Sequence, residues 1–594
     1  MSIASGPEVV TRGAVKRRQP WIERATDADH KAVSLMFIAG AFGFLALAVT
    51  MLILTRIQLL VPQNTIIAPE VFNRIASAQG ITFMVLFALP LMLGIAGYVA
   101  PLQVGARGLA FPRLGLLSFY LYLFGGVALF ATFLYVPADA GPAALPPLSS
   151  SVYNPAAGVD GWIAAMVLAL GGFVLFALNL SVTLRKLRAP GMAWRRVAPF
   201  AWASNVAATT LLFVGPVMLA GLVMLLIDRH FGGTFFDSGA GGAPILYQHI
   251  NWIFFAGAWA IVLTLAAGTI SEIVPVMAGK PLLSHRATLG SLAAIPPLAV
   301  GAWVQNMYDV QVGIGFQVLA MILALSLALP IGTLIINWIA TIWGGAVRSR
   351  VAMSFVVASI SALGFGLSLE FALSVIPIGW QLDNTAFAQA ATTYTMVGAA
   401  VFGGFAAMHY WMPKMTGRFV GEGVARAALG VMVVGLHLFC IPLLIAGLNG
   451  QPVDVFEYYG DASGVPMDVA AWNLISSFGG FVLALGVLIE LGNLSYGYLN
   501  GGRAGHDPWG GSTLEWFALS PPPRHNFDAV PDVRSAEPLR DIRESVRMRG
   551  LGEPTSGRGV HGRAAVVEGG AGGAGAERSS EAAAERDESR GPVA

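Results

Sequence analysis

The chain has 594 residues, of which 56% are apolar and 11% are charged, and its formal net charge is +2. Soluble proteins carry charges on roughly a quarter of their residues, so this composition excludes an ordinary cytosolic enzyme and indicates a protein whose main solvent is lipid. The small net charge gives no support for a nucleic-acid partner, and the single cysteine, Cys440, excludes an intrachain disulfide and an iron–sulfur cluster held by this chain alone.

The first predicted element is an apolar run over 33–61, after a polar N-terminal segment that ends near Lys31. The run is too long for a signal-peptide core and no small-residue cleavage pattern follows it, so it is predicted to be a retained membrane helix. Eleven further runs of membrane-spanning length predict an all-α membrane protein with twelve transmembrane helices. These runs lie near 77–100, 113–136, 161–184, 202–227, 247–276, 287–308, 313–343, 351–378, 387–412, 424–448 and 469–499.

The connections between these runs alternate in charge. One set is basic and is predicted to face the cytoplasm; it carries Arg107, Arg113, Arg185, Lys186, Arg188, Arg195, Arg196, Lys280, Arg286, Arg348, Arg350, Lys414 and Arg418. The other set is acidic; it carries Asp139, Asp160, Asp237, Asp309, Asp383, Asp454, Glu457 and Asp461. An even number of spans then places both termini in the cytoplasm.

Four regions are predicted along the chain. Residues 1–32 form a cytoplasmic N-terminal segment, 33–500 the twelve-helix membrane domain, and 501–527 a cytoplasmic segment rich in motifs. From about 528 the chain turns to Gly, Ala, Glu and Arg with few aromatic residues. Such a composition cannot bury enough apolar surface to order itself, so 528–594 is predicted to be a disordered tail.

Six different sequence motifs stand out along the predicted helices and after the last of them. They are PLQVGARGLAFPRL at 101–114, LYQHINW at 246–252, ISEIVP at 270–275, NWIATIWGG at 337–345, YWMPKMTGR at 410–418, and the pair DPWGGSTLEW and SPPPRHNF within 507–527. In this order and spacing the chain resembles subunit I of the haem-copper respiratory oxidases over roughly 33–527. The resemblance implies the twelve-helix subunit I fold, a bacterial cytoplasmic membrane, and other oxidase subunits or a complete oxidase as partners.

The family holds two haems and one copper ion through six histidines, because imidazole is a good ligand for both iron and copper. This chain has nine histidines in all, and only His249, His409 and His437 lie in or at the edge of the predicted spans. The full cofactor set implied by the resemblance is therefore not expected, and no haem or copper is predicted.

The motifs place each family ligand on a residue that is not histidine. The two axial positions of the low-spin haem fall on Gln79 and Thr393, and that of the high-spin haem falls on Ala391. The copper positions fall on Ala256, Gln305 and Asn306. Amides are poor ligands for copper or haem iron, and alanine is none at all.

The proton-path positions of the family are also replaced; they fall on Gly108, Ala258, Ala260 and Leu334. The arginine pair that would bind the haem carboxylates falls on Val453 and Asp454, and the outer metal site on Asp383 and Asn384. The resemblance therefore implies a retained scaffold from which the redox chemistry has been removed.

Emptying the haem space would leave voids of several hundred Å³, each costing on the order of 10 kcal/mol. Phe255 and Trp259 replace smaller family residues beside the lost copper position, so they are predicted to fill this space. Glu370 lies within the ninth predicted span, where an ionisable group is by default a functional hypothesis. The alternatives for Glu370 are a proton or cation site, or a protonated or arginine-paired side chain that only fills space.

The remaining candidates have structural interpretations. His409 and His437 lie on neighbouring predicted helices, but their depths differ by about 10 Å at 1.5 Å per residue, so they are not expected to be paired haem ligands. His249 is expected to be structural. Glu272 lies at the cytoplasmic end of the sixth span and matches a family residue with a structural or proton-entry role.

Three functions remain open. The leading hypothesis is a cofactor-free structural, assembly or regulatory subunit beside a genuine oxidase, without catalytic activity. The second is a membrane transport or quinone-binding protein that reuses the emptied core, with lipid or quinone bound and Glu370 as its polar group. The third is a terminal oxidase with unorthodox ligation in aerobic electron transport.

Overall fold

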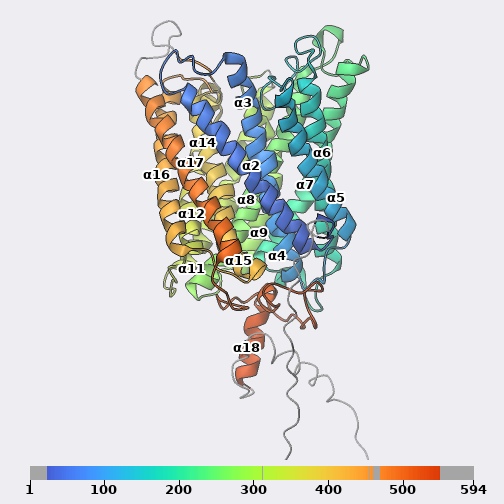
Figure 1. The fold of residues 1–594 in the computed structure, drawn as a ribbon, viewed down its shortest axis with the longest axis vertical. Coiled ribbons are helices and arrows are strands. Elements are labelled where there is room, and N and C mark those ends of the chain that lie inside the picture. Colours follow the sequence, from blue (N-terminus) through green and yellow to red (C-terminus); the bar gives the residue numbers. More distant parts are fainter. Residues whose placement is uncertain (1–22, 24, 311, 454, 459–468, 549–594) are drawn as a thin grey trace, which may run out of the picture.

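The computed structural model is a bundle of long helices that stand side by side, with the C-terminal segment packed under one end (Figure 1). The structure describes residues 23, 25–310, 312–453, 455–458 and 469–548. No strand occurs within these ranges, where extended pairing is limited to isolated bridges such as the one between Arg418 and Arg503. The end under which α18 lies is called the lower end below, and the opposite end the upper end.

Twelve helical spans are long and apolar enough to cross a membrane, which confirms the predicted all-α fold. Most of them are formed by one main helix. These are α2 (His30–Gln58), α5 (Pro112–Ala131), α6 (Ala157–Lys186), α7 (Pro199–His230), α8 (Pro244–Ala278), α9 (His285–Gly301), α12 (Val351–Leu373), α16 (Glu422–Leu448) and α17 (Val469–Asn500).

Three spans are built from consecutive segments. The second joins α3 (Pro69–Ile81), the π-helical η1 (Thr82–Ala88) and α4 (Leu89–Gln103); the eighth joins α10 (Ile314–Ser326) and α11 (Ala328–Ile342); and the tenth joins α14 (Ala386–Met396), the π-helical η6 (Val397–Phe402) and α15 (Gly403–Thr416). Shorter helices are η5 (Trp303–Met307), α13 (Ile376–Leu382) and α18 (Pro538–Met548).

Local sequence signals set many of the helix ends. The Asp29 side chain accepts a hydrogen bond from the backbone nitrogen of Lys31 and caps α2. Pro69 and Pro244 begin α3 and α8, where a missing backbone N–H costs nothing. Gly279, which ends α8, has a φ of 64°, a left-handed conformation that favours glycine. The spans therefore begin and end where short-range chemistry directs.

The second, sixth and tenth spans are the most buried of the twelve. Their helices α3, α8 and α14 carry the three haem-ligand positions and one copper-ligand position of the family, and the other two copper-ligand positions, Gln305 and Asn306, lie on η5. A helix that is apolar all round packs in the interior of a membrane bundle. The packing therefore brings these three helices to the centre, and the candidate site lies between them.

The predicted disordered tail is wrong for residues 528–548. This stretch contains α18 and packs against the lower end, where the Val533 nitrogen donates to the Pro190 oxygen at 3.1 Å and Arg543 pairs with Asp507. Val533 is also buried. A few anchoring contacts to the membrane domain thus order a segment whose composition alone is poor in apolar residues. The rest of the predicted tail, 549–594, lies outside the described residues, as does most of the predicted N-terminal segment.

Candidate functional site

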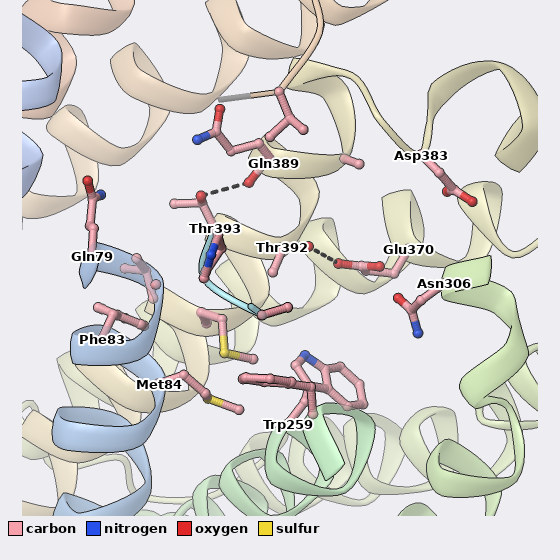
Figure 2. Close-up of a pocket in the computed structure, with 18 of the residues that line it drawn as sticks. Gln79, Phe83, Met84, Trp259, Asn306, Glu370, Asp383, Gln389, Thr392 and Thr393 are labelled. Carbon is pink, nitrogen blue, oxygen red and sulfur yellow. Dashed lines mark hydrogen bonds between the residues drawn. The ribbon is translucent and has the colours of Figure 1, made fainter. Parts of the chain in front are cut away.

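A cavity of about 640 Å³ lies among the central helices. Five of the positions where the family would have ligands line it together: Gln79, Ala256, Gln305, Asn306 and Thr393. Figure 2 shows Gln79 and Thr393 on different helices facing the same space, with Asn306 and Glu370 at its other side. The structure therefore gathers around one cavity residues that are far apart in the sequence.

Val453, Asp383 and Asn384 also line this cavity, whereas the position at Asp454 lies outside the described residues. Five other predicted positions do not line it. Ala391, Ala258 and Ala260 are fully buried in helix packing. Leu334 is also buried and lines a separate cavity of about 20 Å³. Gly108 lies in the connection after α4, with open space where a side chain would be.

The polar side chains at the two low-spin haem positions make hydrogen bonds to neighbouring residues of the chain. Gln79 Oε1 accepts a hydrogen bond from Thr55 Oγ1 at 3.3 Å, and Thr393 Oγ1 donates to the backbone oxygen of Gln389 at 2.7 Å. Neither an amide nor a hydroxyl supplies the imidazole nitrogen that haem iron takes from this family. These residues do not fit an axially ligated haem.

The copper position has the same character. Gln305 Oε1 accepts from Ser374 Oγ at 3.1 Å, Asn306 Nδ2 donates to the Trp303 oxygen at 3.4 Å, and Ala256 has no donor atom in its side chain. Throughout the described ranges, no three His, Cys, Asp or Glu side chains group closely enough to hold a metal ion. The donor set does not fit a copper ion either.

The prediction that Phe255 and Trp259 fill the haem space is wrong as stated. Both side chains are only partly buried and line the cavity (Figure 2 labels Trp259). They lie on one face of α8 and form part of the cavity wall without filling the cavity. The sequence shows the added volume of the two side chains, whereas the volume left open depends on how the surrounding helices pack.

A mostly apolar cavity of this size has an energetic consequence. At roughly 24 cal/mol per Å³, leaving it empty would cost on the order of 15 kcal/mol, comparable to the whole free energy of unfolding of a typical domain. We therefore expect lipid, a ligand or water to occupy it in the membrane.

Carboxyl groups gather at one end of the cavity. Glu370, on α12, accepts a hydrogen bond from Thr392 Oγ1 at 3.0 Å. Asp383 follows α13, and burial, helped by the charges of Glu370 and Asp309, raises the pKa of its carboxyl to about 8. Asp309 is exposed and accepts from Asn384 Nδ2 at 2.6 Å. A series of acidic groups thus leads from the surface to Glu370, and no arginine pairs with Glu370 among the described residues.

His409 has a carboxylate partner that the sequence analysis missed. Its Nε2 lies 2.7 Å from Glu490 Oε1, both residues are buried, and its ring stacks on Phe355. His437 instead makes an edge contact with Tyr394. The expectation that the two histidines are not paired ligands agrees with these separate surroundings. His249 accepts a hydrogen bond from Trp303, which agrees with its structural interpretation.

Two polar clusters lie at the lower end, outside the cavity. In one, the buried Glu515 accepts from Gln103 Nε2 at 3.1 Å and burial raises the pKa of its carboxyl. Glu272 lies near it and accepts from the backbone nitrogen of Phe200 at 3.1 Å. Both carboxyls are held by donors from other segments, which favours the structural interpretation of Glu272.

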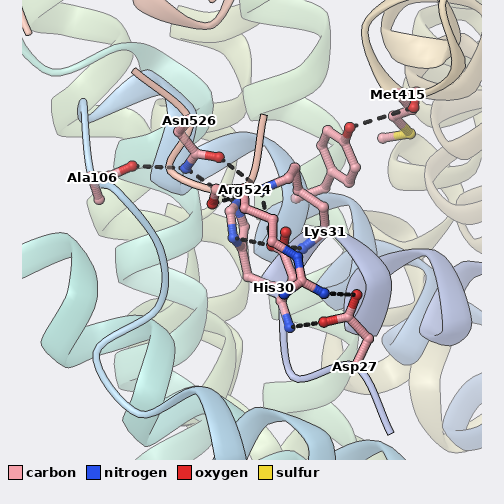
Figure 3. Close-up of polar contacts among 9 residues, drawn as sticks. Asp27, His30, Lys31, Ala106, Met415, Arg524 and Asn526 are labelled. Atoms are coloured by element: carbon pink, nitrogen blue, oxygen red, sulfur yellow. Dashed lines mark hydrogen bonds and ion pairs between the residues drawn. The ribbon is translucent and has the colours of Figure 1, made fainter. Parts of the chain in front are cut away.

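The second cluster joins the start of α2 to the C-terminal segment (Figure 3). Lys31 Nζ donates to Asn526 Oδ1 at 2.9 Å and to the Arg524 oxygen at 3.2 Å. Asn526 Nδ2 in turn donates to the Ala106 oxygen at 2.8 Å, and Arg524 pairs with Asp27 at 3.1 Å. These contacts connect three segments that are remote in the sequence.

The sequence matches a known protein family over most of its length. The model of the family described as Cytochrome C and Quinol oxidase polypeptide I matches residues 32–482. A cytochrome c oxidase subunit 1 of Bacillus subtilis is 33% identical over 517 residues, which cover 86% of this chain and 82% of that protein. One of Thermostichus vulcanus is 33% identical over 515 residues, covering 86% of this chain and 92% of that protein.

A solved structure has the same fold. It is described as a heme-copper terminal oxidase dimer and is similar with a TM-score of 0.70 over 84% of this chain and 88% of that chain. At 14% sequence identity, this similarity concerns the fold alone.

Proposed function

The chain belongs to the cytochrome c and quinol oxidase subunit I family, and from this we propose that it serves a respiratory membrane complex as a subunit that holds no haem and no copper. One observation carries the proposal. In the described part of the chain, no imidazole lines the cavity at the family's cofactor positions, where amide, hydroxyl and methyl groups stand instead. Without ligands for iron or copper, the chain has no means to reduce oxygen itself.

The proposed role is then to associate with other subunits of the complex. The matched relatives are named as oxidase subunits, and one of Aeropyrum pernix is named as a heme-copper oxidase subunit I+III. A twelve-helix scaffold that retains the family's loop motifs fits a structural, assembly or regulatory role beside other oxidase subunits. By the positive-inside rule we place the lower end, with the basic connections, on the cytoplasmic side of a bacterial membrane.

A reduced-minus-oxidised optical spectrum with metal analysis on the purified chain tests the proposal. We expect haem and copper well below one per chain, together with co-purification of oxidase subunits in mild detergent. Stoichiometric haem would overturn the proposal and support a terminal oxidase with unorthodox ligation. Capture of no oxidase subunit would remove the partner role.

A matched variant shows whether the expression host supplies haem. Gln79→His with Thr393→His places an imidazole on each side of the same cavity, and bis-histidine ligation suits low-spin haem. We expect this variant to acquire a haem absorbance that the unmodified chain lacks. In a host that loads haem into an authentic oxidase, a haem-free spectrum from both preparations would show that the cavity does not accept haem even with ligands restored.

A second candidate function, transport or quinone binding in the emptied core, is favoured by one observation. Asp309, Asp383 and Glu370 form a series of acidic groups from the upper end into the cavity. Extraction of the purified protein and analysis of its lipids would test the quinone form. A quinone present at about one per chain would support it, and an extract no richer in quinone than the bulk membrane would exclude it.

A further inference from the structure

The charge of the cavity lining is unbalanced at one end. Glu370, Asp383 and Asp309 all line it there, and the hydrogen-bond partners of Glu370 and Asp309 are a hydroxyl and an amide, not cations. Asp383 Oδ2 is buried and has no hydrogen-bond partner. Among the described lining residues, the arginine Arg56 lies over the ring of Phe439 on another part of the wall. A ligand at this end would meet acidic groups with no basic group of the described chain facing them.

Aromatic side chains form part of the wall. Trp252, Phe255 and Trp259 lie at spacings of three and four residues on α8, so they share one face of the helix, and all three line the cavity. Figure 2 shows Trp259 across the space from the acidic group formed by Glu370 and Asp383. The faces of indole and benzene rings attract cations at short range, most strongly where water is excluded.

A buried amide adds a second polar feature. Asn251 is fully buried, lines the cavity one residue before Trp252, and neither its nitrogen nor its oxygen has a hydrogen-bond partner. Buried amides are nearly always hydrogen-bonded, so an unpartnered one beside a cavity points to a missing partner such as a ligand or a water molecule.

We propose that the cavity binds a lipophilic organic cation, meaning an apolar body that carries a protonated or quaternary nitrogen. The acidic end would hold the charged nitrogen, the aromatic face of α8 would pack against it, and the apolar remainder would take the body. The volume of about 640 Å³ is within the range of pockets that hold small organic molecules. The proposal rests on the proposed function, because it requires the cavity to be free of haem.

The discriminating measurement uses two probes of nearly the same shape and opposite charge. Tetraphenylphosphonium and tetraphenylborate are added to the full-length protein in detergent, and binding is measured by equilibrium dialysis, with empty micelles as the blank. We expect saturable binding of about one tetraphenylphosphonium per chain and at least tenfold weaker binding of tetraphenylborate. Equal binding of the two, or no saturable binding, would overturn the proposal.

Variants locate the bound cation. Glu370→Gln is expected to weaken tetraphenylphosphonium binding about tenfold. If this variant does not fold, Asp383→Asn provides a second test, because Asp383 lies after α13 and not within a membrane-spanning helix. Glu422→Gln is the matched control, because Glu422 pairs with Arg350 and Arg426 at the surface away from the cavity. Unchanged binding in both cavity variants would overturn the proposal.

The result is separable from that of the proposed function. A haem-free spectrum with no selective cation binding would refute this inference and leave the haem-free subunit standing. Stoichiometric haem in the same preparation would refute both, because haem would occupy the space.

Discussion

Asp383 gives the stability of this protein an expected dependence on pH. Burial and the charges of Glu370 and Asp309 raise the pKa of its carboxyl to about 8, whereas an unfolded aspartate titrates near pH 4. A raised folded pKa means that its contribution to stability is fully present below about pH 4 and is lost as pH rises through 8. Across this window the unfolded chain ionises the carboxyl while the folded state keeps it protonated, so the folded state becomes less stable relative to the unfolded chain.

The test compares melting temperatures of the unmodified chain and Asp383→Asn from pH 5 to 9. We expect the difference between them to change in favour of the variant up to about pH 8 and then to level off. Glu422→Gln removes a surface carboxylate instead and should show no such trend. A difference that is constant across the range would contradict the raised pKa.

For single residues, the sequence predicts which residues belong to the site better than it predicts which residues surround them. Motif spacing predicted that Gln79 and Thr393 belong to one site, and the structure brings them to one cavity. Motif spacing could not show that Asp383 lies near Glu370, because the two residues are on different elements joined by a turn whose geometry depends on packing. The missed partner of His409, Glu490, lies 81 residues away and carries no local signal.

Glycines at helix crossings determine how closely α16 and α17 approach. A Cβ on Gly435 of α16 would collide with the backbone of Leu483 on α17, and one on Gly479 would collide with the backbone of Phe439. In lipid, helices associate largely through close backbone packing at small residues. The close approach of the two helices therefore depends on Gly435 of α16, which faces α17, and on Gly479 of α17, which faces α16.

Gly435→Ala should force α16 and α17 apart. Overpacking of a tight interface costs about 1–3 kcal/mol, so we expect a clearly lower melting temperature in detergent. Gly430→Ala is the control on the same helix, because an added Cβ there would meet nothing within 4 Å. Equal melting temperatures for the two variants would show that the crossing tolerates separation.

Helix existence follows from the sequence, whereas helix interruption does not. Runs of apolar residues long enough to cross a bilayer predicted all twelve spans. The π-helical segments η1 and η6 begin three and four residues after Gln79 and Thr393, respectively, and nothing in the local sequence marks them. Such segments are often found at functional sites, and here both lie beside the cavity.

At the scale of the whole molecule, the family fold is kept, and in the proposed function its cofactor chemistry is lost. The fold depends on apolar length, capping residues and glycine contacts, which are distributed over the entire chain. Cofactor binding in the family depends on only six side chains. Replacement of the six can therefore leave the bundle intact, but it leaves a cavity whose volume the sequence could not predict.

The cluster around Lys31 attaches the segment that follows the membrane domain to the start of α2 at the lower end. The Nζ of Lys31 donates hydrogen bonds to Asn526 Oδ1 and the Arg524 oxygen, and Asn526 Nδ2 donates to the Ala106 oxygen, so the C-terminal segment is attached to both α2 and the connection after α4.

The variant Lys31→Met keeps the length of the side chain but removes the donors. It leaves the buried amide oxygen of Asn526 unsatisfied, at a cost of about 1–3 kcal/mol. We expect amide hydrogen exchange in 501–527 to accelerate at least fivefold, while exchange in the central helices stays unchanged. Lys280→Met is the matched control, because Lys280 donates to the Ala340 and Trp343 oxygens at a different connection. If exchange in 501–527 were the same in both variants, the C-terminal segment would be held by its other contacts, such as the hydrogen bond from Gln103 to Glu515, and the cluster would not be what orders it.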